Sequence, residues 1–167
     1  LGKPYEPNAI IKNDMEFILM QRKPGGYRQP TNMQRDASRI DKEEFNRWFQ
    51  QIWNITGAST KQHPAPFPLE LATRLVRMFS FTGDTVFDPF CGSGTTMIAA
   101  LRTGRNSIGI DIDPEYCRMA ARYLKAENAD LFATTKLVFE KATAEPASLV
   151  KEDLALYEVR PARKKLA

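Results

Sequence analysis

Long apolar runs, disulfide frameworks and metal-ligand clusters are all missing from this sequence of 167 residues. No apolar run approaches the ~20 residues that a membrane-spanning helix needs, and no secretory signal is recognisable at its start. The two cysteines, Cys91 and Cys117, form neither a metal-binding spacing nor a disulfide pattern, so we predict no metal site. These absences argue against a membrane protein and a disulfide-stapled secreted domain. We expect a cytoplasmic protein with no membrane partner.

The composition is that of an ordinary globular domain. Hydrophobic residues make up 43% of the chain and charged residues 26%, and 167 residues suffice for one buried core. The formal net charge of +4 weakly favours a polyanionic partner.

The first half of the chain alternates loops with short predicted elements. Residues 9–23 predict an antiparallel hairpin, and the Arg-rich, Gly/Pro-containing residues 23–39 predict a loop. Helices are predicted over 41–53 and 69–79, separated by a proline-containing loop. The side chains predicted to face inward from these two helices are Phe45, Trp48, Phe49, Ile52, Leu71, Ala72, Leu75 and either Met78 or Phe79.

In the second half of the chain, predicted strands and helices alternate. A strand over 84–90, a glycine turn, a helix over 95–103, a strand over 106–112 and a helix over 114–124 follow one another. This order predicts an α/β fold with a mainly parallel, Rossmann-like sheet. Residues 136–140 are a candidate for one further strand.

The glycine turn predicts a ligand site. Gly92 and Gly94 allow the backbone to approach a ligand closely, while Thr95 and Thr96 open a helix whose N-terminus attracts an anion. No lysine follows the last glycine as in a P-loop, and the third glycine of the dinucleotide fingerprint is absent. A small anion is therefore expected, although a purely structural turn stays open.

An acidic residue supplies the second half of this site. Asp111 closes the second strand, 23 residues after Asp88, where a carboxylate accepts ribose hydroxyls in doubly wound sheets. A ribose on Asp111 and a small anion at the helix start together indicate S-adenosyl-L-methionine (SAM).

Four segments carry a resemblance to a known family. The motif Asp88-Pro89-Phe90-Cys91-Gly92-Ser93-Gly94-Thr95-Thr96 resembles the SAM-binding motif of DNA amino-methyltransferases, which methylate an exocyclic amine of adenine or cytosine. The preceding HPAPFP (63–68) resembles the segment before that motif in the circularly permuted β-class. GRNSIGIDIDPEY (104–116) is similar to the family's second strand, and residues 2–28 resemble strands that end its catalytic half. The resemblance implies a class I SAM-dependent methyltransferase fold.

The resemblance implies a role for each matching position. Asp88 to Phe90 would line the methionine end of SAM, Gly92 to Thr96 its carboxylate, Asp111 the ribose and Ile112 the adenine. The loop His63 to Pro68 would close over the methionine, with the histidine ring holding the loop rather than moving a proton. The implied cofactor-binding residues are His63, Pro64, Phe67, Asp88, Pro89, Phe90, Gly92, Ser93, Gly94, Thr95, Thr96, Asp111 and Ile112.

The catalytic loop of that family has no counterpart here. The family uses a Pro-Pro-aromatic loop to accept hydrogen bonds from the amine, and this chain contains no Pro-Pro dipeptide. Asp113-Pro114-Glu115-Tyr116 looks similar, but its position after a strand predicts a helix N-cap instead. We therefore predict no catalytic residues here and no methylation by this chain alone. The chain would be the C-terminal part of a longer enzyme, or one half of a split enzyme whose second subunit brings the loop.

Basic residues between the predicted hairpin and the proline loop suggest double-stranded DNA as the partner. Arg28, Arg35, Arg39 and Lys61 are candidates for DNA binding, although a solvated basic loop explains them equally well.

The resemblance implies four regions: 1–28 from the catalytic half, 29–62 for target recognition, 63–145 for SAM, and a basic tail, 146–167. Two other functions stay open, a non-catalytic SAM-binding regulatory module and an RNA or small-molecule methyltransferase. Restriction-modification is the expected setting, and a homodimer stays open.

Overall fold

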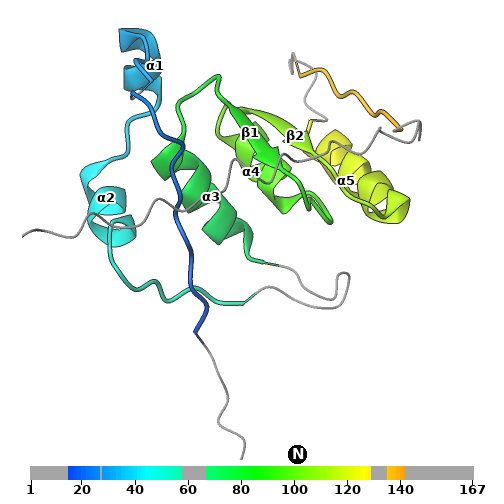
Figure 1. Ribbon diagram of the computed structural model, residues 1–167, viewed down its shortest axis with the longest axis horizontal. Coiled ribbons are helices and arrows are strands. Elements are labelled where there is room, and N and C mark those ends of the chain that lie inside the picture. Colours follow the sequence, from blue (N-terminus) through cyan, green and yellow to red (C-terminus); the bar gives the residue numbers. More distant parts are fainter. Residues whose placement is uncertain (1–14, 27, 58–66, 129–134, 142–167) are drawn as a thin grey trace, which may run out of the picture.

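The computed structural model describes residues 15–26, 28–57, 67–128 and 135–141. Along them the elements are α1 (Asn32–Ala37), α2 (Lys42–Trp48), α3 (Leu69–Phe79), β1 (Thr85–Asp88), α4 (Thr95–Arg102), β2 (Asn106–Gly109) and α5 (Pro114–Glu127) (Figure 1). Within these residues, none of the helices has both the length and the apolar character that crossing a lipid bilayer requires.

The β1–α4–β2–α5 unit is the one that the sequence predicts. Its two strands pair in parallel, with Thr85 opposite Asn106 and Asp88 opposite Gly109. Helix α4 forms the crossover between the strands, and α5 begins at Pro114 directly after β2. The carboxyl ends of both strands therefore lie at the same edge of the sheet.

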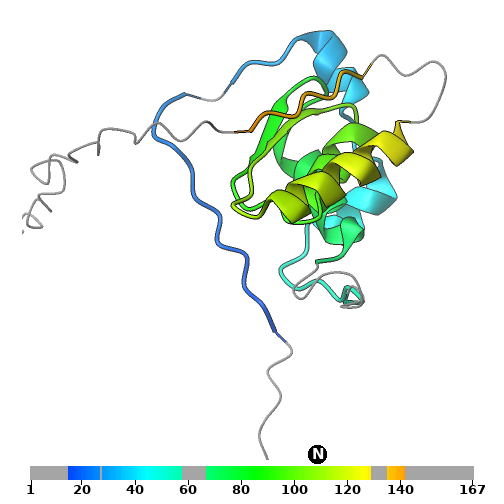
Figure 2. The ribbon, with the colours of Figure 1, turned by 90° about the vertical axis from the view of Figure 1, so that its right-hand side faces the viewer.

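Helices α4 and α5 cover one side of this two-stranded sheet (Figure 2). The buried core on that side forms two clusters, one of Cys91, Met97, Ala120 and Leu124 and one of Ala72, Val76 and Ala99. On the other side Phe87, Ile108 and Ile110 are each more than half exposed. Parallel sheets are normally covered on both faces, so this apolar face is incompletely packed within the described residues.

Helices α2 and α3 form where predicted, but their buried faces differ from the prediction. In α3 the buried residues are Ala72, Arg74 and Val76, whereas Phe79 is 59% exposed. Arg74 is buried because its guanidinium lies over the ring of Trp53, 5.4 Å from the centroid, and pairs with Glu70.

Helix α2 is shorter than predicted, ending at Trp48, which is its one buried residue. Phe45 and Phe49 stack on each other with ring centroids 4.4 Å apart and stay about half exposed, and Ile52 lies beyond the helix. The predicted apolar face therefore reduces to Trp48.

Helix α1 lies where the sequence predicts a loop. Thr31 accepts a hydrogen bond from the Gln34 backbone, and the Gln34 side chain accepts one from the Thr31 backbone, which makes a complete capping box. This signal, a threonine followed three residues later by a glutamine, was available in the sequence.

Two segments predicted as strands form none. Residues 15–20 and 136–140 carry no strand, and the other arm of the predicted hairpin, residues 9–14, lies outside the described residues. Figure 2 shows the segment 15–26 (blue) standing clear of the sheet. A strand forms only where its backbone N–H and C=O groups pair with a neighbouring strand, and the described sheet consists of β1 and β2.

Candidate functional site

The turn between β1 and α4 has a conformation that requires glycine. Gly92 and Gly94 have φ angles of +50° and +88°. A Cβ on Gly94 would lie 2.9 Å from the Cβ of Ala120 in α5. The turn is held by bonds from the Cys91 N–H to the Ile110 carbonyl and from the Gly94 N–H to the Cys91 carbonyl, both 2.8 Å. Close packing and backbone geometry thus fix its shape.

The carboxylate of Asp111 joins this turn to the one after β2. Its Oδ2 accepts a hydrogen bond from the Gly92 N–H at 2.8 Å, and its Oδ1 accepts one from the Asp113 N–H at 2.9 Å. The structure therefore brings together two residues predicted for one site, Gly92 and Asp111, at the carboxyl ends of the two strands. A carboxylate has about four acceptor positions, so these two bonds leave room for further donors.

The N-terminus of α4 opens at this turn without a capping side chain. Gly94 is its N-cap residue and adopts the left-handed conformation, so no side chain accepts from the first-turn N–H groups. Thr95 and Thr96 begin the helix and are partly buried. Uncapped first-turn N–H groups and the helix dipole make this end suited to a small anion.

Exposed apolar side chains border the turn. Ile112 is fully exposed and Phe90 is 86% exposed, although both are large and hydrophobic. Next to them, Asp88 Oδ1 accepts a hydrogen bond from the Phe90 N–H at 3.0 Å, which shapes the start of the turn. The site therefore combines an anion-binding helix end, a carboxylate and open apolar surface.

Cys91, inside the motif, is a packing residue. It is 5% exposed, and burial raises the pKa of its thiol to about 11, with smaller contributions from Cys117 and the carboxylates of Asp111 and Asp88. The thiol is neutral at physiological pH and is therefore not a nucleophile.

A pocket lies between β1 and α3. This pocket of about 360 Å³ is lined by Phe67, Ala72, Leu75, Val76, Phe79, Ser80, Thr85, Val86 and Thr96. It brings Phe67 and Thr96, both predicted cofactor-binding residues, to one surface. His63, Pro64 and Lys61 lie outside the described residues.

The motif-like Asp113-Pro114-Glu115-Tyr116 is a helix start, as predicted. The Asp113 side chain accepts a hydrogen bond from the Glu115 N–H at 2.8 Å, and Pro114 is the first residue of α5. Its geometry is that of an N-cap.

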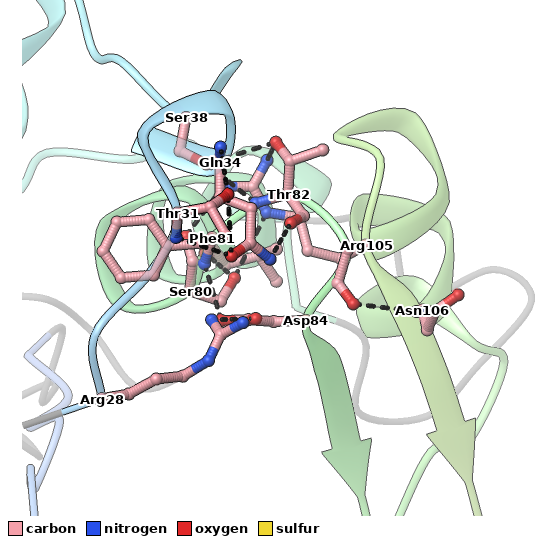
Figure 3. Close-up of polar contacts among 12 residues, drawn as sticks. Arg28, Thr31, Gln34, Ser38, Ser80, Phe81, Thr82, Asp84, Arg105 and Asn106 are labelled. Carbon is pink, nitrogen blue, oxygen red and sulfur yellow. Dashed lines mark hydrogen bonds and ion pairs between the residues drawn. The ribbon is translucent and has the colours of Figure 1, made fainter. Parts of the chain in front are cut away.

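The arginines predicted to contact DNA are engaged within the protein. Arg28 forms an ion pair with Asp84 and lies over the ring of Phe81, at the start of β1 and therefore at the edge opposite the glycine turn (Figure 3). Arg39 pairs with Asp36 at 2.7 Å on an exposed surface. Arg35 donates to the Gln29 side chain at 3.3 Å.

Two buried arginines were not predicted from the sequence. Arg105 is 7% exposed and donates to the Ser80 carbonyl at 2.8 Å and to the Thr103 carbonyl. Burial lowers the pKa of its guanidinium. Arg74, described above, is the other. No spacing or motif marks either residue, because arginine in a sequence indicates surface.

Comparison with known proteins gives a consistent set of relatives. The sequence profile of the family described as DNA methylase matches residues 2–122. The chain is 50% identical over 115 residues to the type II methyltransferase M.MjaI of Methanocaldococcus jannaschii, covering 64% of this chain and 37% of that protein. It is 42% identical over 121 residues to the type II methyltransferase M.MthZI of Methanothermobacter thermautotrophicus, covering 66% of this chain and 34% of that protein.

A solved structure supports the same relationship. The fold is similar to that of TTHA0409, a putative DNA modification methylase of Thermus thermophilus solved in complex with S-adenosyl-L-methionine. The TM-score is 0.66 and the identity 56%, covering 74% of this chain and 49% of that one. With this likeness the predicted α/β Rossmann-like fold is confirmed. The chain spans about a third of the length of the two curated relatives and about half of the solved one.

Proposed function

The chain belongs to the DNA methylase family, and from that membership we propose that it supplies the SAM-binding part of an enzyme that methylates an exocyclic amine of adenine or cytosine in DNA. The observation that carries this proposal is the meeting of the glycine turn and Asp111 at the carboxyl ends of two parallel strands, through the 2.8 Å bond between Gly92 and Asp111. In open α/β sheets, ligands bind at the carboxyl ends of the strands.

Each part of SAM has a group of suitable chemistry at this edge. The first-turn N–H groups of α4 and the Thr95 and Thr96 hydroxyls suit the amino-acid carboxylate, because no side chain caps that helix end. The free acceptor positions of Asp111 suit the ribose hydroxyls. Ile112, fully exposed, offers apolar surface for the adenine ring. Asp88 and Phe90 would border the methionine end, and Phe67 would add apolar surface beside it.

When bound, SAM supplies an electrophilic methyl group, and the residues of this chain hold and orient it. The amine that receives the methyl has its lone pair delocalised into the base, so acceptors for its protons are needed beside it. No Pro-Pro-aromatic loop exists in this sequence to provide them. We therefore propose that these 167 residues alone bind SAM without transferring its methyl group.

The free side of β1 suggests where the rest of the enzyme joins, because among the described residues β1 pairs with β2 alone. The carbonyls of Asp84 and Asp88 accept bonds from Asn106 and Ile110 of the β2 side, at 2.8 and 2.9 Å. Because backbone groups alternate along a strand, those of Thr85 point to the opposite edge, beside the 360 Å³ pocket. A further strand with alternating apolar side chains fits this edge, and about half of TTHA0409 lies outside the match.

Double-stranded DNA is the proposed substrate, and a cytoplasmic restriction-modification system is the proposed setting, since two relatives are named as type II methyltransferases. Arg35 and Arg39 are the described candidates for phosphate contact, because Arg28 is held by Asp84. Competition between duplex DNA and duplex RNA of the same sequence tests the choice. Equal or stronger competition by RNA would favour an RNA methyltransferase.

Calorimetric titration of the chain with SAM tests the proposed function. We expect saturable binding with one site per chain, and S-adenosylhomocysteine should compete for it. A matched variant is Ile112→Ser, which removes the exposed apolar surface and is expected to weaken binding, whereas Ile52→Ser, also exposed but remote from the turn, is not. Absence of SAM binding by the folded wild-type chain would remove the proposal.

A further inference from the structure

We propose that Asp111 is a positioning residue for the glycine turn, in addition to a ligand of the ribose, and that it couples the two ends of the cofactor site. The inference rests on the proposed function only for the identity of the ligand. The coupling itself comes from contacts that the protein makes without any ligand.

The two carboxylate oxygens of Asp111 each accept a hydrogen bond from a different turn. Oδ2 accepts from the Gly92 N–H at 2.8 Å, and Oδ1 accepts from the Asp113 N–H at 2.9 Å. One side chain therefore anchors the turn at the amino-acid end of the site and the turn at the adenine end, where Ile112 lies. Each bond joins a charged acceptor to a backbone donor, which is the stronger class of hydrogen bond.

The bond to Asp111 prevents the Gly92 N–H from binding the carboxylate of the ligand. A donor already committed to Asp111 is not free to bind an incoming carboxylate, so Gly92 acts on the turn and not on the ligand. The anion-binding N–H groups are then those beyond it, at Ser93 and the first turn of α4. Their position depends on the path of the chain through Gly92, whose φ of +50° is one of several conformations open to glycine, so the bond to Asp111 helps to select it.

The two bonds of Asp111 predict how a substitution at this position changes the affinity for SAM. If Asp111 holds the turn, loss of one carboxylate oxygen disturbs the amino-acid end as well as the ribose end. An asparagine at this position has a single carbonyl acceptor, so it serves either Gly92 or Asp113, and its NH2 group faces the other donor. Asp111→Asn is therefore a nearly isosteric way to release one of the two turns.

Two probes separate the ends of the site. SAM carries both an amino-acid end and a ribose–adenine end, whereas 5′-methylthioadenosine carries the ribose and adenine but no amino acid. A residue that contacts ribose alone weakens both ligands by the same factor. A residue that also positions the turn weakens SAM more.

The experiment is calorimetric titration of wild type, Asp111→Asn and the control Asp113→Asn with each probe. For Asp111→Asn we expect the loss of SAM affinity to exceed the loss for methylthioadenosine by roughly fivefold or more, as for one charge-assisted hydrogen bond. Asp113→Asn alters a neighbouring carboxylate that caps α5 and does not touch the glycine turn. It is expected to change both affinities equally. Equal losses for Asp111→Asn, in a variant whose Gly92 N–H exchanges faster than in wild type and is therefore released, overturn the proposal.

A second measurement needs neither a variant nor a ligand. Amide hydrogen exchange of the ligand-free wild-type chain is expected to show the Gly92 N–H protected relative to the Ser93 N–H. Exchange of Gly92 as fast as Ser93 overturns the positioning role even if Asp111→Asn fails to fold. Failure of SAM to bind the wild-type chain, with Gly92 protected, instead removes the proposed function and leaves the positioning role standing.

Discussion

Gly94 shows how a single missing side chain sets the geometry of the whole site. Its φ of +88° lies in the left-handed region, and the space where a Cβ would stand is taken by Ala120 of α5. The position therefore needs glycine for two independent reasons, backbone conformation and helix packing.

We expect Gly94→Ala to lower the free energy of unfolding by roughly 2–4 kcal/mol, from the left-handed conformation and the overpacking together. Urea denaturation followed by circular dichroism measures the change. Gly57→Ala is the control, because a Cβ at Gly57 has nothing within 4 Å and its φ is not in the left-handed region. A loss no larger than that of Gly57→Ala would contradict the packing argument.

For single residues, the sequence predicted those that a particular backbone conformation requires. It did not predict the arginines that are buried in the fold. Gly92 and Asp111 were identified because a turn after a strand demands particular residue types. Arg105 and Arg74 were not, because their burial depends on partners that are close in space and not in sequence. The sequence likewise did not indicate that Arg28, a candidate for DNA binding, forms an ion pair with Asp84; its contact with DNA stays a prediction.

Among the elements, the first two helices are attached to the rest through polar contacts. Figure 3 shows α1 held to the segment before β1 by Gln34, which donates to the Thr82 carbonyl at 3.2 Å, and by Ser38, which accepts from the Thr82 N–H at 2.8 Å. Helix α2 is held by Arg77 of α3, which pairs with Glu44 at 2.6 Å and lies 4.8 Å from the centroid of the Trp48 ring.

We expect Arg77→Met to lower the free energy of unfolding by about 1–2 kcal/mol, because Glu44 is then left mostly buried without its partner. A double-mutant cycle with Glu44→Gln should return a favourable coupling energy. Arg39→Met is the control, since its pair with Asp36 is exposed and such pairs contribute about 0–1 kcal/mol. A coupling energy near zero would mean that α2 is held by the Trp48 contact alone.

The sequence predicted the elements of the second half well and those of the first half poorly. The β1–α4–β2–α5 unit is recognisable because each strand leads directly into a turn and a helix whose apolar residues face it. Residues 15–20 and 136–140 have strand-like composition, but a strand forms only beside a partner. Helix α1 was not predicted because the proline and glycine residues around it favour a loop, whereas in the structure the capping box at Thr31 stabilises a short helix.

For the whole molecule, the central expectation is separation of cofactor binding from catalysis. Incubated with radiolabelled SAM and duplex DNA, the purified chain is expected to transfer no methyl group above background, because its sequence carries no acceptor loop for the amine. Methyl transfer by residues 1–167 without a partner would falsify this expectation.

Assembly with the rest of the fold provides the complementary measurement. We expect the chain to form a complex with a polypeptide comprising the part of TTHA0409 that it does not match, detectable by sedimentation. Phe79→Glu, which places a charge in the pocket beside β1, should prevent complex formation. Ile52→Glu, at a similarly exposed position away from that pocket, should not.

The one-sided sheet also bears on how such a polypeptide survives in a cell. An apolar face formed by Phe87, Ile108 and Ile110 lies next to an edge of β1 that no strand of the described part of the chain covers. Such an edge is a template for pairing with any extended chain nearby, including another copy of itself. The interval between synthesis and covering of that edge is thus the period of greatest exposure to aggregation and to chaperones. Producing the covering polypeptide at the same time and place would shorten that interval, so simultaneous expression should yield more soluble protein than later mixing.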